Sequence, residues 1–105
     1  MNFGDYISQK RKEKNFTIRE LANRLEISFT YLSDVEKGRS KAFKQEILKK
    51  IIEVLQLNKE ESDILNDLAG ESQGSVAPDI AEYLKNHPEA VVAFRKNVIR
   101  KEKNE

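Results

Sequence analysis

The sequence predicts an all-α protein, and three observations support that prediction. Glycine and proline together number only six among the 105 residues. No stretch alternates apolar and polar residues for long enough to form a strand, whereas apolar residues recur at helical spacing along the chain. A hydrophobic fraction of 38% beside a charged fraction of 35% is typical of one small helical domain with a short appendage.

Five helices are predicted in a first domain, residues 1–69. Asn2 is the expected N-cap of a helix over 3–14, and the capping box Thr17–Glu20 opens a second over 18–25. Ser28 is the expected cap of a third over 29–36. A fourth helix is predicted over 44–55, and Asn58 is expected to cap a fifth, with Ile64, Leu65 and Leu68 facing inward.

A C-terminal extension is predicted after a polar linker over 70–77. Two helices, 78–86 and 88 to about 101, each carry proline in the first turn, and 102–105 form a tail that we expect to be disordered. The second of these helices carries an apolar stripe of Val91, Phe94 and Val98. Two short helices cannot bury such a stripe alone, so it packs either on the first domain or on a second chain. We expect the first domain.

Charge is distributed unevenly along the chain. Residues 1–50 carry 12 Lys and Arg against 7 Asp and Glu, a net of +5, whereas residues 51–77 carry one Lys against six acids, a net of −5. A basic half beside an acidic segment suggests one surface that meets a polyanion, although scattered solvated charge is the competing explanation.

Several functional classes lack any support in the residues. There is no cysteine, no cluster of metal-ligating side chains and no nucleophile–base pair, so we predict no catalysis, no metal and no cofactor. No apolar run approaches the roughly 20 residues of a membrane span, and the first residues lack the pattern of a signal peptide. We therefore expect a cytoplasmic protein that does not contact membranes.

Two short helices joined by three residues form a helix-turn-helix pattern in FTIRELANRLEISFTYLSDVEKGR, residues 16–39. Ala22 is small where the two helices must cross, and Ile27, Leu32 and Val35 are apolar where the second must be anchored. With its E-L-A-x-x-L, Y-L-S-x-V-E and K-G pieces, this stretch resembles the Xre family, to which the lambda and 434 repressors and Cro belong. The resemblance implies a five-helix lambda-repressor-like fold over residues 3–69. It also implies a transcriptional regulator that binds double-stranded DNA as a homodimer on a palindromic operator.

The resemblance also implies which residues meet DNA. It places Phe29, Thr30, Ser33 and Asp34 on the base-reading face, and the hydroxyl of Ser28 is able to join them. It places Thr17, Ile18, Arg19, Lys37, Arg39, Ser40, Lys41 and Lys44 beside phosphates. Tyr31 is added to the phosphate group, with burial against the first helix as its alternative. Arg11 is expected to form a structural ion pair with Glu36 rather than to bind DNA.

Two departures from the family pattern weaken the expected base reading. Ile18 stands where the family often has a glutamine that braces a reading side chain, and Asp34 stands where a basic or amide side chain is common. None of the reading residues makes a bidentate pair with guanine or adenine, which is worth about 1–3 kcal/mol of discrimination. Phe29 and the methyl group of Thr30 suit thymine methyl groups, so groove shape and backbone charge must supply much of the recognition.

The favoured function is a DNA-binding repressor that excludes polymerase from its operator. The alternative is a protein-interaction module, such as an antitoxin or inhibitor, which uses the same scaffold to bind a protein partner. Asp34 and the weak reading set support that alternative. The basic first half argues against it.

Overall fold

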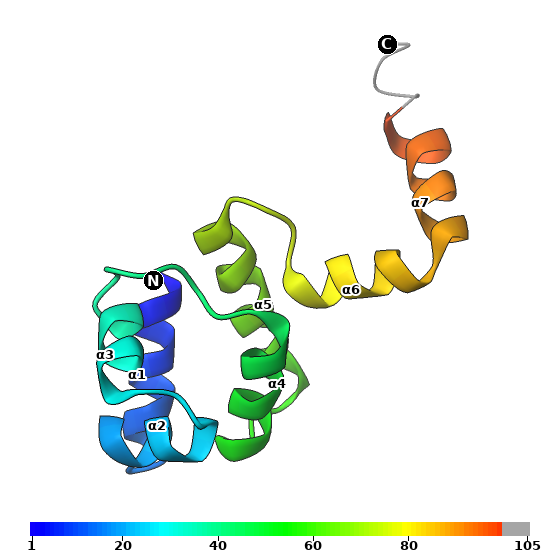
Figure 1. Cartoon of the computed structure of the whole chain (residues 1–105). Helices are drawn as coiled ribbons and strands as arrows, with labels where there is room; N and C mark the ends of the chain where they lie inside the picture. The colour runs from blue at the N-terminus through cyan, green and yellow to red at the C-terminus, as the bar shows by residue number, and fades with distance from the viewer. Residues whose placement is uncertain (100–105) are drawn as a thin grey trace.

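The computed structural model describes residues 1–99 and confirms the all-α class (Figure 1). Helices account for all its regular structure: α1 (Phe3–Glu13), α2 (Ile18–Leu25), α3 (Phe29–Glu36), α4 (Gln45–Val54), α5 (Lys59–Gln73), α6 (Pro78–Asn86), α7 (Pro88–Phe94) and a π-helical turn, η1 (Arg95–Ile99). The predicted tail over 102–105 lies outside the described residues. No helix among residues 1–99 is long and apolar enough to cross a membrane.

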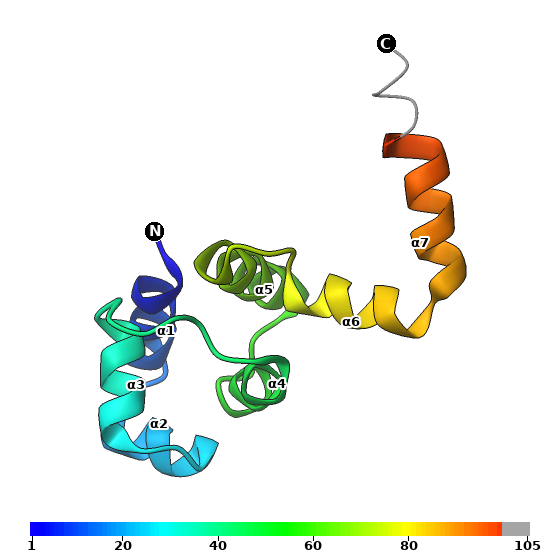
Figure 2. The ribbon, with the colours of Figure 1, turned by 45° about the horizontal axis from the view of Figure 1, so that its top comes forward.

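The first five helices enclose one hydrophobic core. Helix α1 packs on α3 and α5, and α2 packs on α3 and α4, as two views of the ribbon show (Figures 1 and 2). Phe43, in the connector between α3 and α4, is fully buried, and its ring makes edge contacts with Phe3 at 5.9 Å and Tyr31 at 5.1 Å between centroids. Phe43 therefore anchors the loop after α3 to the hydrophobic core.

Capping side chains define four of the helix starts, as predicted. Asn2, Thr17, Ser28 and Asn58 each accept a hydrogen bond from the backbone N–H three residues later. The boxes at Thr17 and Asn58 are reciprocal, because Glu20 and Glu61 accept from the backbone of their caps. These bonds satisfy amides that have no partner within the helix, which is why the starts were readable from the sequence.

Two glycines mark close approaches of backbone to backbone. A Cβ at Gly4 would lie 2.4 Å from the carbonyl oxygen of Val35, so α1 and α3 meet at a distance that no other residue allows. A Cβ at Gly70 would lie 2.8 Å from the backbone nitrogen of Ala77. The end of α5 is therefore in tight contact with the segment that leads into α6.

The structure corrects the predicted end of the fifth helix and one of its inward residues. Helix α5 continues to Gln73 and ends at Gly74 in the left-handed conformation (φ 68°), so the first four residues of the predicted linker are helical. Ile64 is 46% exposed, while Leu65, Asn66 and Ala69 are buried. The buried face of α5 thus includes Ala69 and Gly70, and Gly70 lies against the backbone of Ala77 in the segment that follows; Leu68 is half-buried against the core as predicted.

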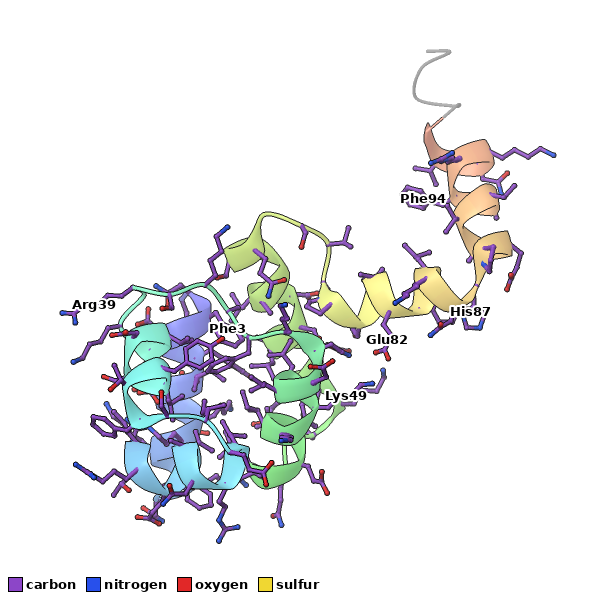
Figure 3. The ribbon with its side chains drawn as sticks, viewed as in Figure 1. Phe3, Arg39, Lys49, Glu82, His87 and Phe94 are labelled. Atoms are coloured by element: carbon purple, nitrogen blue, oxygen red, sulfur yellow. The ribbon has the colours of Figure 1, made fainter. Side chains whose placement is uncertain are left out.

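The two C-terminal helices form an arm, defined here as residues 78–99, of which only the first helix docks on the body. Glu82 of α6 accepts from Lys49 at 2.9 Å and from Gln45 at 3.1 Å, both on α4 (Figure 3). The chain bends at His87 and α7 projects from the body; its main contacts among residues 1–99 are with α6 and with η1, which follows it (Figures 1 and 3).

The expectation that the apolar stripe packs on the first domain is therefore wrong. Phe94 is 54% exposed and Val98 is 40% exposed, and neither is part of the hydrophobic core. The bend at His87–Pro88 explains the result, because a residue before proline is pushed out of the helical region and redirects the chain. Pattern alone does not reveal in which direction such a bend carries the next helix.

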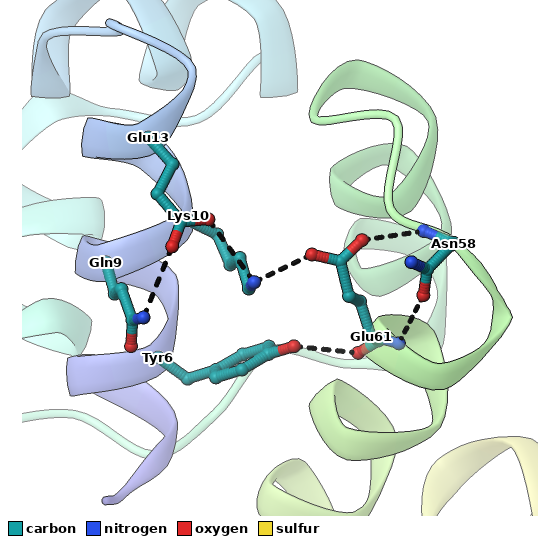
Figure 4. Close-up of polar contacts among 6 residues, drawn as sticks. All are labelled: Tyr6, Gln9, Lys10, Glu13, Asn58 and Glu61. Atoms are coloured by element: carbon teal, nitrogen blue, oxygen red, sulfur yellow. Dashed lines mark hydrogen bonds and ion pairs between the residues drawn. The ribbon is translucent and has the colours of Figure 1, made fainter.

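A polar network joins α1 to the start of α5 (Figure 4). The ammonium of Lys10 donates to Glu61 at 2.7 Å and lies 3.3 Å from Glu13, while the hydroxyl of Tyr6 donates to the carbonyl of Glu61 at 3.3 Å. The backbone N–H of Asn58 and the ammonium of Lys10 hold the pKa of Glu61 below its usual value. The same hydrogen bond to Glu61 raises the pKa of Lys10.

The lowered pKa of Glu61 predicts an acid-sensitive contribution to stability. In the unfolded chain Glu61 has the ordinary glutamate pKa, about 4.3, and in the folded chain its pKa is lower. The carboxylate therefore stabilises the folded state fully above the unfolded pKa, and this stabilisation is lost as the pH falls through the folded pKa. Between neutral pH and about pH 3, Glu61→Gln should therefore show a smaller loss of melting temperature than the unmodified chain. Glu60→Gln, at an exposed neighbouring position, is the control. An equal loss of melting temperature in all three proteins would show that Glu61 does not contribute to acid sensitivity.

Candidate nucleic-acid interface

The turn between α2 and α3 leaves one face of α3 uncovered. Glu26 adopts the left-handed conformation (φ 59°) that the short turn requires, and its carboxylate pairs with Lys50 at 3.0 Å. Ala22 is buried where α2 meets α3, and Leu32 and Val35 are buried on the inner face of α3. These contacts hold α3 by its inner face. Its opposite face, which includes Phe29 and Thr30, is exposed to solvent.

The N-terminal end of α3 carries the exposed part of the predicted reading set. Phe29 is 44% exposed, Thr30 is exposed and Asp34 is half-buried. The hydroxyl oxygen of Ser28 accepts from the backbone N–H of Tyr31 at 3.0 Å, which leaves its O–H able to donate. Apolar Phe29 and the Thr30 methyl therefore form the main surface that a base edge would meet.

Ser33 was placed on the reading face, and the structure contradicts that placement. It is only 9% exposed, lying in a turn of α3 that also buries Leu32 and Val35. The helix is short and packs on both α1 and α2, so its buried sector is wider than the two-residue stripe assumed from the pattern.

The start of α2 offers less to phosphates than the sequence predicted. The hydroxyl oxygen of Thr17 accepts from Glu20 at 3.1 Å as part of the capping box. Ile18 is half-buried and packs against the core, so its side chain does not face solvent as a phosphate contact would require. Arg19 is exposed, but its guanidinium carbon lies 5.0 Å from the centre of the Phe29 ring. Arg19 is thus held beside the first residue of α3.

The loop after α3 presents a group of basic side chains. Lys37, Lys41 and Lys44 are exposed, and no carboxylate of residues 1–99 lies within 4.0 Å of any of them. The ring of Tyr31 packs on Phe43, and Tyr31 remains 38% exposed. With Ser40, Lys41, Lys44 and others it lines a hollow of about 430 Å³. Unpaired cations around a hydroxyl-lined hollow suit a phosphate oxygen.

Two residues that sequence reasoning assigned to a linker hold this loop in place. The hydroxyl oxygen of Ser72 accepts from the backbone N–H of Ala42 at 2.9 Å. The side-chain amide of Gln73 donates to the carbonyls of Ala42 and Phe43, at 3.2 and 3.0 Å. These contacts join positions 30 residues apart, and no local pattern signals them. The last turn of α5 therefore positions the basic loop.

Asp34 has an intramolecular partner that reduces its conflict with a polyanion. A guanidinium nitrogen of Arg39 lies 4.0 Å from its carboxylate, and the backbone carbonyl of Asp34 accepts from the N–H groups of Arg39 and Ser40. Asp34 thus helps to shape the turn that leads into the basic loop. The Arg39 side chain is well exposed, Asp34 is only half-buried and the separation is long, so the ion pair itself is weak.

The predicted ion pair between Arg11 and Glu36 is present and nearly buried. The two guanidinium nitrogens of Arg11 lie 2.9 and 3.0 Å from the two carboxylate oxygens, and a third bond goes to the carbonyl of Phe16 at 2.8 Å. The pair connects α1 to the last residue of α3. Arg11 therefore helps to fix the position of α3 and does not contribute a free charge.

Asp34→Asn should tighten binding to duplex DNA of random sequence. The substitution removes a negative charge near the expected phosphates and releases Arg39 from its partner. The gain should be on the order of 1 kcal/mol or less, as for exposed charge pairs, and a titration at fixed salt measures it. Asp63→Asn, on the distant α5, is the control. Complete loss of DNA binding would instead make Asp34 a base-reading or structurally essential residue.

The chain is similar to known helix-turn-helix proteins. A family model described as helix-turn-helix matches residues 7–62, which is more than half of the chain. No curated protein matches the chain. Among solved structures, the SinR protein/SinI protein complex contains a similar chain, with a TM-score of 0.48 and 23% sequence identity over 86% of this chain and 98% of that one.

Proposed function

Since this chain belongs to the Xre (lambda/Cro-like) helix-turn-helix family of DNA-binding transcription regulators, we propose that it is a repressor that binds a palindromic operator as a homodimer. One observation supports the proposal above all others. Tyr31, in the first turn of α3, lines one hollow with Lys41 and Lys44 of the following loop, and no carboxylate of residues 1–99 lies within 4.0 Å of either lysine. A surface for base edges thus adjoins a surface for phosphates, as helix-turn-helix recognition requires.

The proposed reading of the operator relies on apolar contacts more than on hydrogen bonds. Phe29 and the methyl group of Thr30 would pack on thymine methyl groups in the major groove, while Ser28 donates its O–H to a base or a phosphate. The phosphates of the DNA backbone would be bound by the loop after α3 and its neighbour on α3, through Lys37, Arg39, Lys41, Lys44 and Tyr31. Sequence-dependent groove shape would supply the remaining discrimination.

A second copy of this chain is the proposed occupant of the exposed stripe on the arm. Phe94 and Val98 stay exposed on a helix that leaves its own body, so only another chain is able to bury them. The projecting part of the arm also carries exposed charge of both signs, with Glu89 on α7 and Arg95 and Lys96 on η1. An antiparallel pair of arms would bring the acidic part of each against the basic part of the other, as a two-fold interface allows.

Family membership favours this function over a module that only sequesters a protein. A sequestering module has no need of unpaired lysines around the hollow beside Tyr31. The proposed mechanism is steric, because a dimer across the operator occupies the DNA that polymerase needs. Catalysis plays no part in it.

Replacement of Thr30 by alanine tests the proposed reading face. Binding to a selected operator should weaken by about 1–3 kcal/mol, whereas binding to random duplex DNA should stay nearly unchanged, since Thr30 contacts bases and not phosphates. Phe29→Ala should act in the same way. Ser33→Ala, at a buried position of the same helix, controls for changes in α3 itself. Equal loss on both kinds of DNA would show that Thr30 and Phe29 are structural.

A further inference from the structure

Helix α3 lacks a side chain that forms two hydrogen bonds with one base, yet such a side chain stands beside it. Arg19, in the first turn of α2, lies with its guanidinium 5.0 Å from the centre of the Phe29 ring. Phe29 is the first residue of α3 and is 44% exposed. The N-terminal residues of a recognition helix are those that contact base edges. Arg19 is therefore held at the end of α3 that would enter the groove.

The other arginines near α3 are engaged by carboxylates, and Arg19 is not. Arg11 is bound by Glu36, and Arg39 lies 4.0 Å from Asp34. No carboxylate of residues 1–99 lies within 4.0 Å of Arg19. A guanidinium on the face of an aromatic ring keeps its N–H donors at its edges, where they point away from the ring. The position of the guanidinium over the Phe29 ring thus restrains the side chain without consuming its donors.

We propose that Arg19, stacked on Phe29, is the residue that determines specificity for a guanine in each half-site. Its paired donors match the O6 and N7 acceptors of guanine, which is the commonest specific contact in the major groove. The ring of Phe29 would at the same time pack on the methyl group of an adjacent thymine. The inference rests on the proposed function and replaces the earlier assignment of Arg19 to a phosphate.

The chain contains a matched control for this inference. Arg24, at the other end of α2, lies with its guanidinium 5.0 Å from the ring of Phe16. It has the same charge and the same kind of aromatic partner, but that partner, Phe16, lies in the connector before α2 and not on α3. Substitution of Arg24 therefore reproduces the lost stacking and altered charge without touching the proposed reading end.

Selection from a randomised duplex pool tests the inference with Arg19→Lys, Arg24→Lys and the unmodified chain. Lysine keeps the positive charge but not the planar pair of donors. We expect Arg19→Lys to lose its preference for guanine at one position of each half-site, by roughly 5-fold to 150-fold. The salt dependence and the preferences elsewhere should be retained. Arg24→Lys should select the same site as the unmodified chain. Phe29→Leu should weaken the same guanine preference.

Two results would overturn the inference. If Arg19→Lys selects an unchanged site, and Arg19→Ala weakens binding to all sequences alike while reducing the magnitude of the salt slope by about 1, Arg19 contacts a phosphate. That result leaves the proposed function intact. If the unmodified chain enriches no site at all, the proposed function fails and the inference fails with it.

Discussion

A chain that ends after His87 should be a folded monomer, with an operator affinity about 10²-fold to 10⁴-fold below that of the full chain. No residue of α7 belongs to the hydrophobic core, so removal of this helix leaves the core of α1–α5 complete. If the arm joins two copies, the truncated chains bind the two half-sites of the operator independently. The gain in affinity that comes from linking two DNA-binding domains is then lost. Sedimentation measures the assembly, and a titration with the selected operator measures the affinity.

A full-length variant separates loss of the interface from loss of the chain end. Phe94→Asp combined with Val98→Asp places charge on the exposed stripe and should give the same monomer, because buried carboxylates would oppose association. Asn97→Asp, exposed on the same segment, is the control and should remain dimeric. Melting temperature should change little in all three variants. A truncated chain that still sediments as a dimer would assign the interface to residues 1–87 and exclude α7.

Binding to DNA should weaken steeply as salt rises. About four phosphate contacts in each copy, from the basic loop and its neighbours, give a dimer a log–log slope near −7. Affinity should then fall by about 10⁴-fold between 50 and 200 mM salt. The large effect reflects the release of counterions from the DNA, so it should appear on random sequences as well as on the operator.

Reversal of one loop charge shows which residues produce the slope. Lys41→Glu should weaken binding to all sequences alike and make the slope less steep, because Lys41 is exposed with no carboxylate partner within residues 1–99. Lys59→Glu changes charge equally, but at the start of α5. It should leave the slope unchanged. A flat salt response of the unmodified chain would exclude the phosphate-binding loop.

Local chemistry explains which parts of the fold were predictable. The starts of α1, α2, α3 and α5 follow from caps and capping boxes that lie within four residues of each other. The Arg11–Glu36 pair was predicted from a family resemblance and is present at 2.9 Å. Features of this kind depend on short stretches of chain or on a recurring motif.

Features that depend on distant contacts were missed. The role of Ser72 and Gln73 in holding the basic loop arises from bonds across about 30 residues, and their polar character suggested a linker instead. Ser33 is covered because α3 meets two helices at once. The stacking of Arg19 on Phe29 joins two helices across a turn. In each case the environment of the residue depends on how helices far apart in the sequence pack together, and residue type alone does not predict that packing.

The most direct test of DNA reading by α3 is selection of bound sequences from random duplex DNA by the full chain. We predict an enriched palindrome whose half-sites are one helical turn apart, about 34–36 Å, with thymine at the positions that face Phe29 and Thr30. Thr30→Ala should relax the preference at one of those positions only. Recovery of no enriched sequence, at a salt concentration where random DNA is bound, would contradict a reading role for this helix.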